Sequence, residues 1–493
     1  MSGERTTAYL AGLVHELLKL PVETEWVEFK RNNDNPEEIG EYLSALANSA
    51  ALLGKVNGYM VWGVDDQSHD IVGTTFRPAA TKIGNEELEN WLLRLLAPKI
   101  NFRFHEIVVD EQSVVLLEIG AAFRHPVRFR NQEFIRVGSY KKSLKEHPEK
   151  ERDLWRVFDQ TPFERGIAVE HVNSEDIFRL LDCPAFFDLL ELPLPDGRAA
   201  ILDALKEDGL IAPCNAGGWN INNLGMILFA KKLDAFAGLK RKAMRVIHYK
   251  GMSRAETLRE QVGIKGYACG FEGLIGVIMT LVPSNEVIGQ ALRKTVPMFP
   301  ELAVRELVAN ALIHQDFFVT GAGPMVEIFA DRIEITNPGE PLVDTARFVD
   351  TPPKSRNEAL ASLMRRFRIC EERGSGIDKV VIQTELYQLP APLFEVPTGF
   401  TRTILFAYQE LDAMTKPDRV RACYLHACLQ YVQRKVMTNK SLRERFGIDD
   451  SRSALVSRII NATIEAGLVR KITLSESRRD SAYVPFWSQG REL

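Results

Sequence analysis

Acidic and basic side chains near the amino terminus have a spacing that could support phosphodiester chemistry. Glu28 and Lys30 are two residues apart on a predicted strand, so their side chains would face the same side of a sheet. Asp65 and Asp66 come at the end of an apolar predicted strand, 58–64, where α/β sheets present their working groups. Carboxylates that converge there repel one another unless a divalent cation such as Mg²⁺ or Mn²⁺ lies between them.

Such a metal centre could activate water and stabilise a phosphodiester transition state. Lys30 could position the nucleophile or neutralise charge, and Glu23, five residues before Glu28, could complete the set of carboxylates. The alternative is that these acids are solvated groups at the ends of strands.

A second set of polar residues lies on the predicted helix 301–314. Glu306, Asn310 and His314 recur every four residues and would stack on one face of that helix. An Asn in mid-helix is a poor helix former, but its amide suits a metal bound to a triphosphate, while Glu could orient water. The alternative is the solvated side of an ordinary helix. A glycine turn at 372–377 opens another helix, whose backbone N–H groups could meet phosphates.

Basic residues are concentrated in three tracts although the whole chain has a formal charge of −4. The local charge is +6 over 121–145, +5 over 231–245 and +6 over 434–479. Such tracts attract phosphate regardless of nucleic-acid sequence, although a solvated face would have the same composition. The first tract contains Arg124, Arg128, Arg130, Arg136, Lys141, Lys142 and Lys145.

Length and composition indicate a globular protein of several domains. At roughly 150 residues per domain, 493 residues correspond to about three. The apolar stretches fall short of the roughly 20 residues of a membrane helix, and no secretory signal is recognisable, so we expect a cytoplasmic protein without membrane contact. The six cysteines lack metal-binding spacing and read as reduced thiols.

The carboxy-terminal segment has the pattern of a winged helix-turn-helix. A capped helix, 438–447, ends in Gly and is followed by a second helix, 451–466, and by two strands that would form the wing. Arg452 and Arg458 would lie on the exposed side of the second helix, where they could read DNA or RNA. Winged helices also bind proteins, so both uses stay open.

The amino-terminal residues resemble the Schlafen AlbA-type domain over about 15–145. The resemblance is carried, in order, by Glu23-Thr-Glu-Trp-Val-Glu28-Phe-Lys30, Ser44-Ala-Leu-Ala-Asn48, Gly58-Tyr-Met-Val-Trp-Gly-Val-Asp-Asp66 and Phe134-Ile-Arg-Val-Gly-Ser139. It implies that Glu23, Glu28 and Asp66 are the metal-binding acids of a nuclease that acts on RNA. A longer link at 51–57 leaves Asp65 as the alternative to Asp66. Many prokaryotic relatives are instead described as DNA-binding or transcriptional-regulator domains.

The segment 286–410 resembles the GHKL ATPase fold in its divergent, RecG-related version. The resemblance implies that ATP is bound with Mg²⁺ on Asn310, that Glu306 is the candidate general base, and that 351–368 is a lid. Asn337 stands where the family has an adenine-binding Asp, and it accepts a hydrogen bond less strongly, so binding is expected more firmly than hydrolysis. By this resemblance the nucleotide would contact Asn310, Asn337, Gly339, Lys354, Arg356, Gly374 and Gly376.

These observations predict an α/β multidomain protein. The expected parts are a Schlafen AlbA-type α+β domain at 1–150, a helical connecting region with a possible winged element at 151–285, a GHKL-like α/β sandwich at 286–412 and a winged helix-turn-helix at 413–493. The leading hypothesis is a homo-oligomeric, nucleotide-controlled nuclease that needs Mg²⁺ or Mn²⁺, acts on RNA or DNA and serves in phage defence. The alternatives are a non-catalytic, ATP-responsive transcriptional regulator and an oligomeric scaffold.

Overall fold

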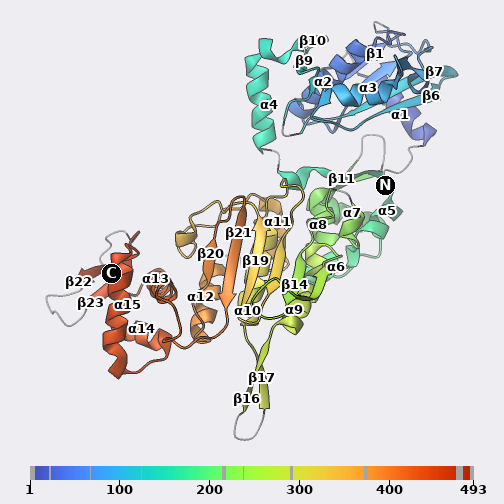
Figure 1. The fold of residues 1–493 in the computed structure, drawn as a ribbon. Coiled ribbons are helices and arrows are strands. Elements are labelled where there is room, and N and C mark those ends of the chain that lie inside the picture. Colours follow the sequence, from blue (N-terminus) through green and yellow to red (C-terminus); the bar gives the residue numbers. More distant parts are fainter. Residues whose placement is uncertain are drawn as a thin grey trace. The chain divides into compact units, whose positions relative to one another are not determined.

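The computed structural model places the chain in two compact units (Figure 1). Unit 1 comprises Met1–Pro162, Glu170–Val172 and Pro213–Asn220, and unit 2 comprises Phe163–Val169, Asn173–Ala212 and Ile221–Leu493. The residues that the structure describes are 6–20, 24–66, 68–123, 125–160, 162–213, 218–236, 238–288, 293–370, 376–473 and 481–488.

Unit 1 is built on two four-stranded sheets and the helix α2 (Pro36–Leu52). The first sheet has the order β1-β2-β7-β6, in which β1 and β2 are parallel and the other pairs antiparallel. The second has the order β10-β9-β8-β5. The strands are β1 (Val27–Lys30), β2 (Asn57–Trp62), β5 (Leu96–Ala97), β6 (Phe102–Val109), β7 (Gln112–Gly120), β8 (Arg128–Phe129), β9 (Gln132–Val137) and β10 (Tyr140–Ser143).

Helix α2 lies at the centre of the unit 1 core. Asn35 caps its first turn and Pro36 occupies a position where the missing N–H costs nothing. The apolar face of this helix is buried, because Ile39, Leu43 and Leu46 are all inaccessible to solvent. The remaining elements of this unit are α1 (Thr7–Leu18), β3 (Lys82–Ile83), β4 (Glu86–Glu87), α3 (Leu88–Leu95) and α4 (Pro148–Gln160).

Two buried polar side chains of α2 tie it to the second sheet. The Asn48 amide donates to the carbonyls of Val127 and Phe134 at 3.0 and 2.8 Å and accepts from the Val127 N–H at 2.7 Å. The Ser44 hydroxyl donates to the Val127 carbonyl and accepts from the Phe134 N–H. Ser44 and Asn48, which carry part of the Schlafen resemblance, therefore position β9 through its backbone.

Substitution of Asn48 by Ala should destabilise unit 1 by about 3 kcal/mol, because it removes three buried hydrogen bonds and leaves the Phe134 carbonyl and the Val127 N–H without their side-chain partner. Five of the six tryptophans lie in unit 1, so urea denaturation followed by tryptophan fluorescence reports on it. Asn90→Ala, on the exposed side of α3, is the control. A loss under 1 kcal/mol for Asn48→Ala would contradict the positioning role.

Unit 2 contains a six-stranded mixed sheet in the order β15-β14-β18-β19-β21-β20. Strand β14 pairs with β18 in parallel, and the other neighbours are antiparallel. Helix α10 packs against β19 and α12. The elements are β14 (Arg245–Tyr249), β15 (Thr257–Val262), α10 (Glu301–Ile313), β18 (Met325–Ile328), β19 (Arg332–Pro338), α11 (Glu358–Arg366), α12 (Gly376–Leu386), β20 (Leu393–Glu395) and β21 (Phe400–Phe406).

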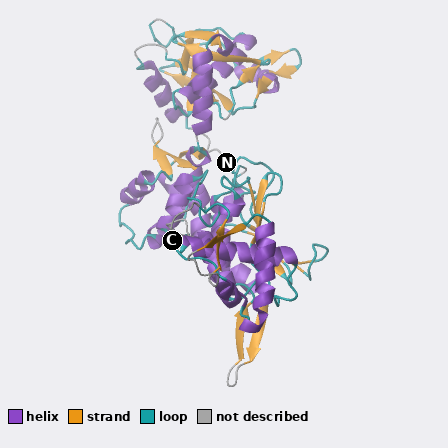
Figure 2. Ribbon diagram, turned by 90° about the vertical axis from the view of Figure 1, so that its left-hand side faces the viewer, coloured by secondary structure: helices purple, strands orange, loops and turns teal. Residues whose placement is uncertain are grey.

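The expected domain boundary at 285/286 cuts through this sheet and is corrected here. Strands β14 and β15 come from the predicted connecting region, yet the parallel pairing of β14 with β18 joins them to the sheet. Between these strands the hairpin β16 (Ser284–Ile288) and β17 (Arg293–Pro297) extends away from the body of the unit in both views (Figure 1 and Figure 2).

The connecting region is mainly helical and also contributes a three-stranded sheet with the order β11-β13-β12. No helix of the described segments is both long and apolar enough to cross a membrane. The five cysteines that the structure describes are free thiols. The elements are β11 (Ile167–Val172), α5 (Ser174–Leu180), α6 (Cys183–Leu189), α7 (Arg198–Glu207), β12 (Ile211–Pro213), β13 (Trp219–Asn222), α8 (Asn223–Phe229) and α9 (Tyr267–Leu281).

The carboxy-terminal segment forms three helices and an antiparallel hairpin. The Thr438 side chain caps α14 and Gly447 ends it in the left-handed conformation, as the sequence pattern predicts. Helix α13 precedes the expected elements and packs on α15. The expected wing tip at 475–480 lies outside the described residues. The elements are α13 (Lys416–Val432), α14 (Asn439–Phe446), α15 (Ser453–Glu465), β22 (Val469–Thr473) and β23 (Ser481–Pro485).

Candidate nucleotide pocket and acidic site

A cavity of about 840 Å³ lies within unit 2 and is lined by residues of α10, β19, β21, α11 and the start of α12. Its volume falls in the range of small-ligand pockets. The polar lining includes Glu306, Asn310, His314, Asn337, Lys354, Ser355, Arg356, Arg365, Thr401 and Thr403. The apolar lining includes Leu307, Ile335, Leu342, Val343, Phe348 and Ile377. One site thus combines an apolar wall with carboxylate, amide and basic groups.

The polar residues of α10 line this cavity together. Glu306, Asn310 and His314 are spaced by one helical turn and all contribute to the wall, although Glu306 is 7% exposed. Burial and the positive charge of Arg356 lower the pKa of His314 to about 4. At neutral pH the imidazole is therefore uncharged.

Two glycines at the pocket lie against neighbouring side chains. A Cβ on Gly376 would lie 2.0 Å from the Glu306 Oε1 atom, so a side chain at the start of α12 would displace this carboxylate. Gly339 has φ +99°, and a Cβ there would lie 2.0 Å from an Arg356 nitrogen. Gly376 lines the cavity, whereas Gly339 lies in the turn beside Asn337 and is not among the lining residues. Gly374 lies outside the described residues.

The segment expected as a lid is anchored to the end of α10. Arg356 donates to the carbonyls of His314 and Glu340 at 3.2 and 2.6 Å. The Asn357 amide donates to the carbonyls of Ile313 and Gln315 at 2.7 and 2.8 Å. The bonds to Ile313 and His314 satisfy carbonyls that the end of α10 leaves open, so this part of the predicted lid supports the pocket wall.

The stability of unit 2 should decrease as the pH is lowered, because the folded protein holds His314 neutral. Its folded pKa of about 4 lies below the ordinary 6.5, so the unfolded chain takes up a proton between these values that the folded chain does not. Stability should therefore fall by about 2 kcal/mol between pH 7 and pH 5 from this group alone. His314→Gln should reduce that loss, as measured by urea denaturation at both pH values. An equal pH dependence in the variant would contradict the buried neutral imidazole.

Three pocket residues are not recognisable as site residues in the sequence. Thr401 and Thr403 are two apart on β21 and face the cavity together, and Arg365 reaches it from α11. The period of two along β21 predicts a shared face for the threonines, but only the pairing of β21 with β19 shows which face it is.

The acidic site of unit 1 is built around a buried carboxylate. Glu28 on β1 is 2% exposed and forms ion pairs with Arg136 and with Lys30, whose Nζ lies 2.5 Å from the Glu28 Oε1. Lys30 and Glu28 share one side of the strand, as their spacing predicts. Two cations therefore balance Glu28, which could not otherwise be buried as an anion.

An aromatic ring organises the positive charges beside Glu28. The cationic groups of Lys30, Arg136 and Lys141 lie 5.2, 5.6 and 4.5 Å from the centre of the Tyr42 ring. Burial, followed by the charge of Glu28, raises the pKa of the Tyr42 hydroxyl above its ordinary range. Tyr42 therefore stays protonated and can donate a hydrogen bond in this site.

The other predicted metal ligands, Asp65, Asp66 and Glu23, are not buried as Glu28 is or lie outside the described residues. Asp65 is partly buried, accepts from the Ser68 N–H at 3.0 Å and lies 3.7 Å from Arg31. Asp66 is exposed in the turn after β2. Glu23 lies outside the described residues.

The prediction that Arg136 contacts nucleic acid is corrected by its burial. Its side chain has 0% exposure and pairs with Glu28, so it cannot reach a phosphate from the surface. The local charge counted over 121–145 does not include this pairing, because the neutralising Glu28 lies on β1, more than 100 residues earlier in the chain.

The remaining basic residues are near the surface, and most are close to acids. Arg128 lies 4.0 Å from Glu133, Arg130 lies 2.5 Å from Glu37, and Lys141 pairs with Glu41. Lys142 is exposed and lies 5.9 Å from the Tyr140 ring centre. Arg124 lies outside the described residues. In the carboxy-terminal segment Arg452 pairs with Asp412, while Arg458 is exposed on α15.

Comparisons with known families confirm the two resemblances. Residues 23–145 match the family described as "Schlafen, AlbA_2". Residues 321–405 match the family described as "Putative ATP-dependent DNA helicase recG C-terminal". The chain thus combines a segment similar to Schlafen AlbA-type domains with one similar to a GHKL-like ATPase domain.

No curated protein matches the chain. Among solved structures, the DIP2311 protein from Corynebacterium diphtheriae is 18% identical over 97% of this chain and 97% of that one, with a TM-score of 0.42. This degree of structural similarity supports no inference about activity.

Proposed function

We propose that this protein binds ATP in the unit 2 cavity and nucleic acid through its AlbA-type domain, and that the bound nucleotide changes the affinity for nucleic acid. The observation that carries the proposal is the cavity that Glu306 and Asn310 of α10 line together with residues of the segment similar to the RecG-related ATPase family, Gly376 among them. The presence of a Schlafen AlbA-type segment in the same chain supports a nucleic-acid partner.

The residues present in the cavity suit a nucleoside triphosphate. The amide oxygen of Asn310 would hold Mg²⁺, which would neutralise phosphate charge when bound. Lys354 and Arg365 would contact the phosphates, and Asn337 would accept from the adenine amine. Glu306 would orient a water molecule, and Gly376 lets the start of α12 lie against this carboxylate.

Calorimetry with a non-hydrolysable ATP analogue and Mg²⁺ tests the pocket. The parent protein should bind one analogue per chain, and Asn310→Ala should remove the binding heat. Gly376→Ala should do the same because its Cβ would displace Glu306. Glu301→Gln, on the exposed start of α10, is the matched control and should bind as the parent does. Unchanged heats in both Asn310→Ala and Gly376→Ala would contradict the assignment.

The finer proposal is that unit 1 cleaves phosphodiester bonds with Mg²⁺ or Mn²⁺. The juxtaposition of Glu28 and Lys30 supports it, because the Glu28 carboxylate could coordinate a metal while the Lys30 ammonium neutralises charge at the phosphate. Asp66 is exposed and available as a second ligand. A metal at Glu28 would compete with Lys30 and Arg136 for the carboxylate oxygens, so metal binding has to rearrange these ion pairs.

Labelled RNA and DNA incubated with the protein in Mg²⁺ or Mn²⁺ test this cleavage. Glu28→Gln and Asp66→Asn should each lower the rate by about 100-fold or more, since each removes a carboxylate from the reacting site. Asp70→Asn, in the same turn, is the control. Equal rates for folded parent and both site variants would rule out the nuclease.

A non-catalytic transcriptional regulator is the second candidate. It is favoured by the two ion pairs that already neutralise Glu28 and by exposed Arg458 on a segment with the helices and hairpin of a winged helix. A footprint on genomic fragments that survives Glu28→Gln and weakens with Arg458→Ala would support this role. A footprint without sequence selectivity would count against it.

A further inference from the structure

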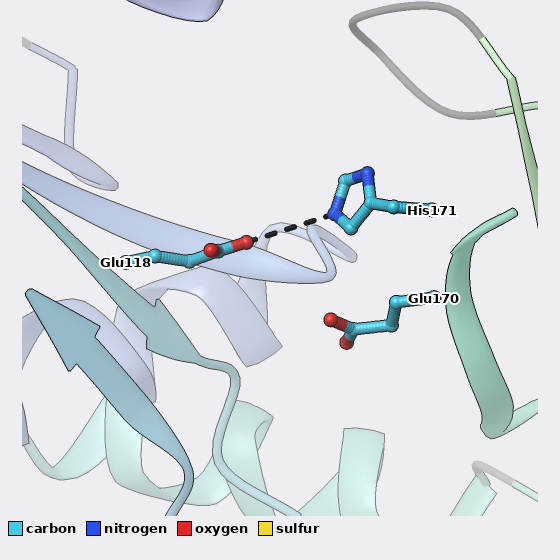
Figure 3. Close-up of side chains that lie close together, drawn as sticks. All are labelled: Glu118, Glu170 and His171. Atoms are coloured by element: carbon cyan, nitrogen blue, oxygen red, sulfur yellow. Dashed lines mark ion pairs between the residues drawn. The ribbon is translucent and has the colours of Figure 1, made fainter. Parts of the chain in front are cut away.

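Two carboxylates and an imidazole converge in unit 1 outside the predicted acidic site. Glu118 lies on β7, while Glu170 and His171 are successive residues of β11. One ligand atom from each of the three lies within 4.8 Å of the other two. Figure 3 shows their polar ends facing one another, with the ion pair between Glu118 and His171 drawn.

A second imidazole approaches the same carboxylate from a neighbouring strand. His105 on β6 has its Nε2 atom 3.5 Å from the Glu118 Oε2, and its side chain is 10% exposed. The His171 Nε2 atom lies 3.8 Å from the other oxygen, Oε1. Glu118 itself is 6% exposed. The centre therefore offers oxygen and nitrogen donors from three strands, with Glu118 buried at its base, His171 partly buried and Glu170 on the exposed side.

Hydrogen bonds outside this group orient the donors. The Tyr9 hydroxyl lies 2.6 Å from the His171 Nδ1, which directs the Nε2 atom toward Glu118. The Asn57 amide donates to the Glu118 Oε1 at 2.8 Å, and the His171 backbone N–H donates to the Asn220 side chain at 3.0 Å. Partners of this kind fix the tautomer and direction of metal-binding side chains.

We infer that Glu118, Glu170 and His171 bind a divalent transition-metal ion, with His105 as an additional nitrogen donor. Two carboxylates beside each other repel, and a cation between them removes that repulsion. Imidazole ligands favour Zn²⁺ and related ions over Mg²⁺ or Ca²⁺, and carboxylates extend the set to Mn²⁺. The class of ligand is therefore Zn²⁺ or Mn²⁺.

The proposed ion would act on the strand through which the chain passes between units. Residues Glu170–Val172 of β11 belong to unit 1, whereas Phe163–Val169 belong to unit 2. A metal shared by β7 and β11 would hold the end of this connecting strand on the AlbA-type domain. Its role would be to order the connection, independently of phosphodiester or nucleotide chemistry.

Metal titration of the full-length protein, stripped with a chelator, tests the site. Calorimetry with Zn²⁺ should show a site that Glu118→Gln and His171→Ala each abolish, and Mn²⁺ should occupy the same site, whereas Mg²⁺ should not compete for it. Tyr9→Phe should weaken binding by about 10-fold, because it removes only the orienting hydroxyl. His15→Ala, which alters an exposed His–carboxylate pair of the same unit, is the matched control and should bind normally.

Two further measurements keep the test decisive. Circular dichroism confirms that each variant is folded, and X-ray absorption of the Zn²⁺-loaded parent should show mixed nitrogen and oxygen ligation that changes in His171→Ala. Glu28→Gln should retain the metal, which separates this site from the proposed nuclease centre. No binding by the parent, parent-like binding by folded Glu118→Gln and His171→Ala, or loss in Glu28→Gln alone would overturn the proposal.

Discussion

Buried carboxylates that need a positive partner constrain the rest of this structure. A carboxylate can be removed from water only if charges or hydrogen bonds replace its hydration. In unit 1 that condition draws Arg136 of β9 and Lys30 of β1 onto Glu28. Since Arg136 is itself held through its backbone N–H by Ser49, the pair fixes the second sheet relative to α2 and β1. Any chemistry at Glu28 thus begins with its negative charge already paired with Lys30 and Arg136.

The same constraint acts in unit 2 by other means. Buried Glu164 accepts from the backbone N–H groups of Ala359 and Leu360 at the start of α11, a helix that lines the cavity. Glu327 on β18 and Glu334 on β19 both form ion pairs with Arg254, which lies between β14 and β15. Helix N–H groups and a shared guanidinium are both effective substitutes for water. The α11 wall of the cavity is thereby fixed by hydrogen bonds that do not involve a ligand.

Local patterns made part of this architecture predictable. The buried face of α2 and the alignment of Glu306, Asn310 and His314 follow from the helical repeat, and the capping of α14 follows from Thr438 and Gly447. Each of these depends on residues within a few turns of one another.

Features that depend on distant pairing could not be predicted in this way. The charge of the 121–145 tract is offset by acids on β1 and α2, which a sum over neighbours in sequence does not include. Strand β14 joins the sheet through a parallel partner some 80 residues later. Glu118 and His171 likewise come together from strands separated by about 50 residues, so no local sequence motif predicts their proximity.

Fluorescence anisotropy of labelled RNA and DNA, with and without a non-hydrolysable ATP analogue, measures most directly whether nucleotide in unit 2 changes how the chain binds nucleic acid, as we propose. We expect at least about a fivefold change in Kd, the lower end of ordinary coupling, which Asn310→Ala removes. An equal Kd in the presence and absence of saturating analogue, for both RNA and DNA, would contradict it.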